Sequence, residues 1–144
     1  MFKKFLFPGN YDQKINIALL FLRVATSAFM LTHGIPKLSK LFSENPITFS
    51  DPIGLWDDIS FVLVVFAEFL CTIFLVIGVA TRFSVIPLII TMIVTGFVAQ
   101  ADSPFDAKEK AFLFLTIFIA LLITGAGRFS IDNFIMRSLT SNDK

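Results

Sequence analysis

Four long apolar runs alternate with short polar stretches along the chain, and this pattern predicts an all-α membrane protein. The runs cover residues 15–35, 60–80, 83–99 and 109–126. Each is close to the roughly 17–25 residues that a helix needs to cross the hydrocarbon core of a bilayer. Hydrophobic residues make up 56% of the chain, above the roughly 45–50% of soluble domains. We therefore expect a four-transmembrane-helix antiparallel bundle that uses residues 1–144 as a single domain.

A short amphipathic segment follows the fourth run. Gly125 and Gly127 favour a turn that ends a helix, and Ser130 suits a helix N-cap. Asp132 then falls in the first turn, where the helix dipole favours an acid. Apolar residues recur on one helical face at Ile131, Phe134, Ile135 and Leu139. The pattern predicts an amphipathic C-terminal surface helix over about residues 130–139, lying on the cytoplasmic surface of the membrane.

The distribution of basic residues gives an orientation for the predicted bundle. The side that holds the termini receives Lys3, Lys4, Lys14, Arg82, Arg128, Arg137 and Lys144, and the opposite side receives Lys37, Lys40, Lys108 and Lys110. Basic residues are enriched on the cytoplasmic side of membrane proteins. We therefore expect both termini in the cytoplasm, with Trp56 and Lys108 outside.

Two charged residues interrupt the apolar runs, namely Arg23 in the first and Glu68 in the second. A charge inside a membrane is costly unless it has a partner, a wet cavity or a function. Counted from the starts of their runs at about 1.5 Å per residue, the two side chains differ in depth by about 6 Å. The sequence therefore predicts a buried Arg23–Glu68 ion pair, which would fix helix partners and register even without a further function.

One helical face of the first run reaches a predicted Gly-Ile-Pro helix stop, and it consists of Arg23, Thr26, Met30, His33, Gly34 and Lys37. The fourth run has a similar stripe of Glu109, Thr116, Ala120 and Gly127, and the third run contributes Thr91, Thr95 and, at its outer end, Gln100. These stripes predict an outward-opening pocket, and its candidate ligand-binding residues are Arg23, His33, Lys37, Glu68, Gln100 and Glu109. A solid bundle held by the ion pair alone is the alternative.

Cysteine and histidine counts limit the chemistry of this pocket. One cysteine cannot form a dithiol, and one histidine cannot ligate a haem from both sides within one chain. No spaced metal-ligand motif and no nucleotide-binding motif occurs, and the net charge of +1 gives no reason to expect nucleic acid. A quinone suits the residues better, because His33 and Lys37 would donate to its carbonyls while Glu68 or Glu109 carried protons.

Three motifs in this order resemble the DoxX family of small bacterial membrane proteins. They are Arg23 followed by HGIPKL (residues 33–38), Glu68 followed by IGVATR (residues 77–82), and GAGRFSID (residues 125–132). The last is similar to the family ending GPGRYSLD, with Ala126 in place of proline. The resemblance implies a four-helix bundle in the bacterial cytoplasmic (inner) membrane. It also implies a structural motif on the cytoplasmic side, consisting of Thr81, Arg82, Gly125, Gly127, Ser130 and Asp132.

Some members of the family are thought to form membrane redox complexes with thiol-handling or superoxide-handling partners. The resemblance thus implies a membrane subunit that supports redox or oxidative-stress chemistry, with a membrane or periplasmic protein partner, or a second copy of the chain, and quinone as the candidate cofactor. A non-catalytic scaffold of a membrane complex and a small-solute or proton carrier remain alternatives. The residues leave open whether the chain is an enzyme or a non-autonomous subunit of an oxidoreductase.

Overall fold

The computed structural model describes residues 11–43, 54 and 56–141, and every regular element in this part of the chain is helical. Three of the basic residues counted on the side of the termini lie outside the described residues, namely Lys3, Lys4 and Lys144. The elements are α2 (Gln13–Leu41), α3 (Asp57–Val65), the π-helix η1 (Phe66–Cys71), α4 (Thr72–Ile77), α5 (Thr81–Ile93), the π-helix η2 (Val94–Ala99), α6 (Phe105–Thr124) and α7 (Ile131–Ser141).

Three helical segments are long and apolar enough to cross a membrane, as judged by length and composition. They are Gln13–Leu41, Asp57–Ile77 and Thr81–Ala99. The prediction of an all-helical membrane protein is confirmed at this level. α6 is also 20 residues long, but charged side chains of Asp106, Lys108, Glu109 and Lys110 occupy its first turns.

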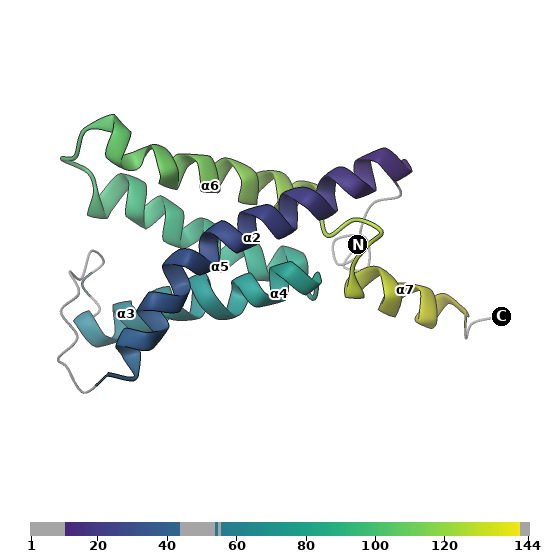
Figure 1. Cartoon of the computed structure of the whole chain (residues 1–144), viewed down its shortest axis with the longest axis horizontal. Coiled ribbons are helices and arrows are strands. Elements are labelled where there is room, and N and C mark those ends of the chain that lie inside the picture. The colour runs from purple at the N-terminus through teal and green to yellow at the C-terminus, as the bar shows by residue number, and fades with distance from the viewer. Residues whose placement is uncertain (1–10, 44–53, 55, 142–144) are drawn as a thin grey trace.

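The helices pack as a bundle in which α5 and α6 lie side by side and α2 crosses the others (Figure 1). α5 turns one face inward, because its buried residues Thr81, Ser84, Val85, Leu88, Thr91 and Met92 recur every three or four positions. The centre of the bundle consists of fully buried Leu75, Val85, Leu88, Phe118 and Leu121. α7 follows at the end of the bundle, near the start of α2 (Figure 1).

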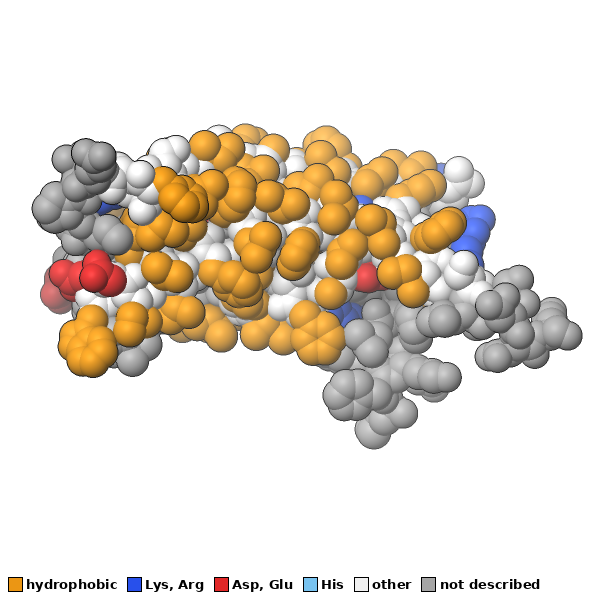
Figure 2. Space-filling view, turned by 90° about the horizontal axis from the view of Figure 1, so that it is seen from below, with side chains coloured by type: hydrophobic (Ala, Val, Ile, Leu, Met, Phe, Trp, Pro, Cys, Tyr) orange, Lys and Arg blue, Asp and Glu red, His pale blue; other side chains and the backbone are white. Residues whose placement is uncertain are grey.

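Large hydrophobic side chains cover much of the outside of the bundle. Phe21 is 74% exposed, Ile123 is 70% exposed and Phe29 is 65% exposed. Figure 2 shows a face of the molecule on which hydrophobic side chains extend over the middle, with acidic side chains at its left end and basic side chains at its right end. Water would make such a surface costly, whereas lipid tails cover it at no penalty.

The first helix is longer than predicted, and the expected stop at Gly34-Ile35-Pro36 is wrong. α2 continues through Pro36 to Leu41 and has 29 residues, so it is about 43 Å long. A proline removes one intrahelical hydrogen bond, and contacts of Gly34 and Lys37 with the neighbouring helix hold the segment on both sides of Pro36. Since a hydrocarbon core is about 30 Å thick, α2 is longer than an upright crossing requires.

Candidate functional site

The carboxylate of Glu68 is buried where η1 packs against α2. Its side chain is 4% exposed, and each of its two oxygens accepts a hydrogen bond of 2.6 Å from Nζ of Lys37 on α2. The Lys37 side chain is 31% exposed, so its ammonium reaches the carboxylate from the edge of the bundle. Short charge-assisted bonds of this kind offset the penalty of burying a carboxylate.

Gly34 brings the two helices close enough for this ion pair. A Cβ atom at Gly34 would lie 2.5 Å from the backbone carbonyl oxygen of Glu68. Only glycine permits such an approach between two backbones. Lys37 follows three residues later, on the same side of α2, and this spacing places its side chain over the Glu68 carboxylate.

The expected ion pair between Arg23 and Glu68 is wrong. Gly34 packs beside Glu68, whereas the Arg23 guanidinium lies beside Gly78, where a Cβ atom would be 2.8 Å from Nη1 of Arg23. Glu68 and Gly78 are ten residues apart, which corresponds to about 15 Å of helix. The prediction counted the depth of each side chain along its own run, and such depths do not reveal how far one helix is shifted along another. The Gly34 contact sets this register.

Arg23 instead binds the loop between α6 and α7. The side chain is buried, and its Nη1 and Nη2 donate hydrogen bonds of 2.6 Å and 2.7 Å to the backbone carbonyls of Ala126 and Phe129. The rigid fork of a guanidinium suits two carbonyls held at fixed positions. Arg23 therefore anchors the loop to the middle of α2.

Asp132 ties α7 to the turn that precedes α5. Its two carboxylate oxygens accept hydrogen bonds from the backbone N–H groups of Ala80 (2.7 Å) and Thr81 (3.0 Å). The carboxylate thus caps α5 from another helix, at the end where the helix dipole favours negative charge. Nearby, Nη2 of Arg82 donates to the carbonyl of Ile123 at 3.0 Å.

The predicted cytoplasmic-side motif therefore meets in space. Ser130 accepts a hydrogen bond of 3.2 Å from the N–H of Asn133 and so caps α7. Gly125 and Gly127 both have positive φ angles, of 77° and 72°. A Cβ atom at Gly125 would lie 3.3 Å from Nε of Arg82. The residues that this end of the bundle brings together are Thr81, Arg82, Gly125, Gly127, Ser130 and Asp132.

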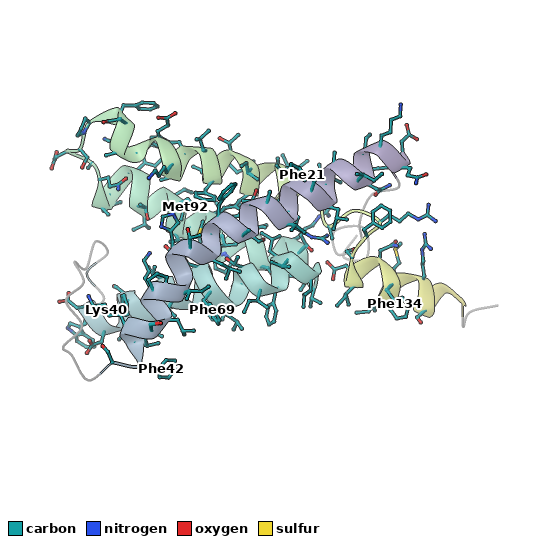
Figure 3. The ribbon with its side chains drawn as sticks, viewed as in Figure 1. Phe21, Lys40, Phe42, Phe69, Met92 and Phe134 are labelled. Atoms are coloured by element: carbon teal, nitrogen blue, oxygen red, sulfur yellow. The ribbon has the colours of Figure 1, made fainter. Side chains whose placement is uncertain are left out.

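A cavity of about 180 Å³ opens beside the Lys37–Glu68 pair. Its walls are formed by Met30, His33, Lys37, Glu68, Met92, Thr95, Gln100, Ala107, Lys110, Ala111 and Phe114. Met92 lies near the crossing of α2 over α5 in Figure 3. Of the six residues proposed from the sequence, the cavity contains His33, Lys37, Glu68 and Gln100. Arg23 and Glu109 are not among its walls.

The stripe predicted on α6 does not border the cavity, so the prediction of its inner face is wrong. Glu109, Thr116 and Ala120 are exposed on the outside of the bundle. The Thr116 hydroxyl donates to the carbonyl of Phe112 at 2.8 Å, so a threonine satisfied within its own helix does not mark an inner face.

The face of α6 that borders the cavity consists of Ala107, Lys110, Ala111 and Phe114. Lys110 was missed by the sequence analysis. The small residues Ala107 and Ala111, spaced one turn apart, are the signal that would have found this face.

Both π-helical segments of the described chain contribute to the cavity. Glu68 belongs to η1, and Thr95 belongs to η2. Gln100, which also borders the cavity, is the C-cap of η2. π-Helical turns are rare and occur frequently at functional sites, because the extra residue re-aims the side chains around it. Nothing in the local sequence indicated either one.

Several polar groups in the cavity have hydrogen-bonding capacity to spare. Oε1 of Gln100 is buried and has no partner among the described residues. His33 and Lys110 are exposed, and the His33 ring packs edge-on against Phe114 at 6.3 Å between centroids. Within the part of the chain that the structure describes, no group of three or more His, Cys, Asp or Glu side chains is placed to hold a metal ion.

Residues 18–101, more than half of the chain, match the sequence profile of the DoxX family. This range includes Arg23, HGIPKL and the segment from Glu68 to Arg82, while GAGRFSID lies beyond it. Neither a curated protein nor a solved structure matches the chain. With a family profile over most of its bundle and three helices suited to cross a bilayer, the chain is a membrane protein of the DoxX family.

Proposed function

We propose that the chain is a membrane subunit that binds a small ligand, a quinone head group above all, beside Glu68 and supports redox chemistry with a partner protein. The observation that carries the proposal is a buried ion pair that borders a cavity. A pair that only joined two helices would not require a cavity beside it. Here Lys37 and Glu68 both retain a side that a ligand can reach.

The size of the cavity favours a single ring. Its volume is about 180 Å³, and a cavity of about 150 Å³ is known to hold benzene. Drug-sized ligands occupy at least roughly 300 Å³. Met30, Met92 and Phe114 supply apolar walls for a ring, and the tail of a quinone would leave through the open side.

The polar groups match the chemistry of a quinone. Lys37, Lys110 and His33 can donate to its two carbonyl oxygens. Reduction to the quinol takes up two electrons and two protons, and Glu68 beside Lys37 is placed to pass protons to the ring oxygens. With a single cysteine and a single histidine in the chain, the electrons come from a partner protein in this proposal.

The membrane arrangement that accompanies the proposal has α6 as a fourth crossing, antiparallel to its neighbour α5, in one domain. The 20 residues of α6 support this, since they span about 30 Å. We place both termini in the cytoplasm of a bacterium and the cavity at the outer side of the inner membrane, where a periplasmic or membrane partner could reach it. The excess of basic residues near the termini supports this orientation.

The test is binding of a short-chain benzoquinone to the full chain in lipid nanodiscs, measured by calorimetry and native mass spectrometry. Wild type is expected to bind, and a Lys37→Met/Glu68→Gln double variant is expected to bind at least tenfold more weakly. Glu109→Gln is the matched control, because this carboxylate is on the same helical turn as Lys110 but faces outward. Absence of binding to wild type would refute the quinone assignment.

A scaffold subunit is the second candidate, and the packed end around Arg23 favours it. There the family motif residues bind backbone groups and one another, without bordering the cavity. In a scaffold, the double variant at Lys37 and Glu68 would leave the function of the complex intact in cells, while Arg23→Met would abolish it through loss of folded protein.

A further inference from the structure

We propose a second binding site, independent of the quinone proposal, that takes the phosphate of an anionic membrane lipid. A cleft of about 500 Å³ lies at the end of the bundle opposite the Lys37–Glu68 cavity, and its walls are Gln13, Arg128, Phe129, Asn133 and Arg137. Two of these five residues are arginines and none is acidic. The cleft is thus positively charged and rich in hydrogen-bond donors.

Arg128 is held in place by its backbone. Its N–H donates to Oδ1 of Asn16 at 2.7 Å, and its carbonyl accepts from Nδ2 of Asn133 at 2.8 Å. Both asparagines are buried, with exposed fractions of 2% and 9%. The Arg128 side chain is exposed, and its guanidinium makes no hydrogen bond or ion pair with any residue that the structure describes. The backbone of Arg128 is thus fixed, and its guanidinium is available to a ligand.

The other walls complete a site for a tetrahedral anion. Asn133 and Arg137 are four residues apart on α7 and share one of its faces. The Arg128 guanidinium suits a phosphate, because it can donate two parallel hydrogen bonds to its oxygens, and Arg137 adds a second positive charge to the same cleft. Gln13, at the first turn of α2, adds an amide donor from the other side.

The surroundings favour a lipid as the source of the phosphate. Next to the cleft, α7 exposes Ile131 (40%), Phe134 (72%, labelled in Figure 3) and Ile135 (47%). An amphipathic helix with arginine beside such a face is typical of the membrane interface. Phe129, 44% exposed, supplies an apolar wall within the cleft itself. The beginning of α2 also meets this cleft, where a helix entering the bilayer passes the head groups.

The test is native mass spectrometry of the full chain released from nanodiscs that contain equal amounts of phosphatidylglycerol and phosphatidylcholine. Wild type is expected to retain phosphatidylglycerol selectively. Since each basic residue near an anionic surface contributes an effect of about fivefold, Arg128→Gln should weaken retention about fivefold, and Arg128→Gln/Arg137→Gln more than tenfold. Lys14→Gln is the matched control, because it removes an equal charge beside Gln13 but does not border the cleft.

Each other outcome overturns the proposal. Equal losses for Lys14→Gln and Arg128→Gln would mean that only the general charge of this end attracts lipid. Equal retention of the two lipids by wild type would exclude a phosphatidylglycerol site. Competition by millimolar inorganic phosphate as effective as that by soluble short-chain phosphatidylglycerol would assign the cleft to free phosphate instead. Circular dichroism of each variant verifies that it is folded.

Discussion

Arg23 and Lys37 lie on the same side of α2, fourteen residues apart, and each is the cation of a polar site inside the bundle. Their surroundings differ. Arg23 donates to two backbone carbonyls in a packed loop, whereas Lys37 binds the side chain of Glu68 at the wall of a cavity. One site is closed by the chain itself, and the other leaves room for a molecule that is not part of the chain.

The difference separates a structural charge from a candidate functional one. Backbone carbonyls cannot be removed or moved without unfolding the loop, so the Arg23 site has one arrangement. Lys37 and Glu68 are two flexible side chains, and either can turn towards a ligand or exchange a proton. Variants at the first site should therefore reduce stability alone, whereas variants at the second should also reduce ligand binding.

The largest expected effect is at Arg23. Arg23→Met removes two charge-assisted hydrogen bonds, each contributing about 1.5–3 kcal/mol, so the free energy of unfolding in detergent should fall by about 3–6 kcal/mol. Lys14→Met, an exposed cation of the same helix, should change it by less than about 0.5 kcal/mol. A loss below about 1 kcal/mol for Arg23→Met would contradict the anchoring role.

The second effect is an asymmetry within the Lys37–Glu68 pair. Lys37→Met leaves a carboxylate that is 4% exposed without its partner, so about 3 kcal/mol should be lost. Glu68→Gln should cost about 1 kcal/mol, because a lysine that is 31% exposed can turn its ammonium to water. Unfolding of both single variants and of the double variant measures the coupling. Additive losses would mean that the two side chains do not interact.

A third, smaller effect is expected at Asp132. Asp132→Asn should lower the free energy of unfolding by about 1–2 kcal/mol, because it removes the charge that caps α5. Hydrogen exchange at the amides of Ala80 and Thr81, which donate to this carboxylate, should become faster. Asp102→Asn, in the exposed turn before α6, serves as the control. Unchanged exchange at both amides would exclude the capping role.

The smallest effect on stability is expected for the neighbours Glu109 and Lys110. Both are exposed, so Glu109→Gln and Lys110→Gln should each change the free energy of unfolding by less than about 0.5 kcal/mol. Only Lys110 borders the cavity, so only its replacement should weaken binding of the benzoquinone, by severalfold in calorimetry. A similar loss for Glu109→Gln would show that net charge, and not contact, controls binding.

Residue patterns predicted which parts of the chain are helical, because apolar runs and helix caps are local signals. The surface helix expected at about residues 130–139 corresponds to α7, Ile131–Ser141. The inward face of α2 was also predicted, since Thr26, Met30 and Gly34 are buried. Periodicity within one helix contains this information without any knowledge of the neighbours.

Contacts between helices were harder to predict. Arg23 was assigned to Glu68 because a glutamate is visible in the sequence as a partner for an arginine. Its true partners are two backbone carbonyls, which no residue type distinguishes. The register of α2 on η1 depends on Gly34 and the Glu68 carbonyl, a single contact of two backbones. The π-helical turns at Glu68 and Thr95 also arise from packing, and they decide which side chains border the cavity.

The carbonyls that bind Arg23 have a consequence for how the loop can vary. Every residue type supplies a backbone carbonyl, proline included, so the acceptors at positions 126 and 129 do not depend on the side chains there. A saturation library of this loop should therefore tolerate many replacements of Phe129, which is 44% exposed. Position 126 is buried, so it should accept small residues and the proline of the family ending, while position 23 accepts arginine alone. The loop must hold two carbonyls in place for Arg23, and this requirement cannot be read from the residue types of the loop.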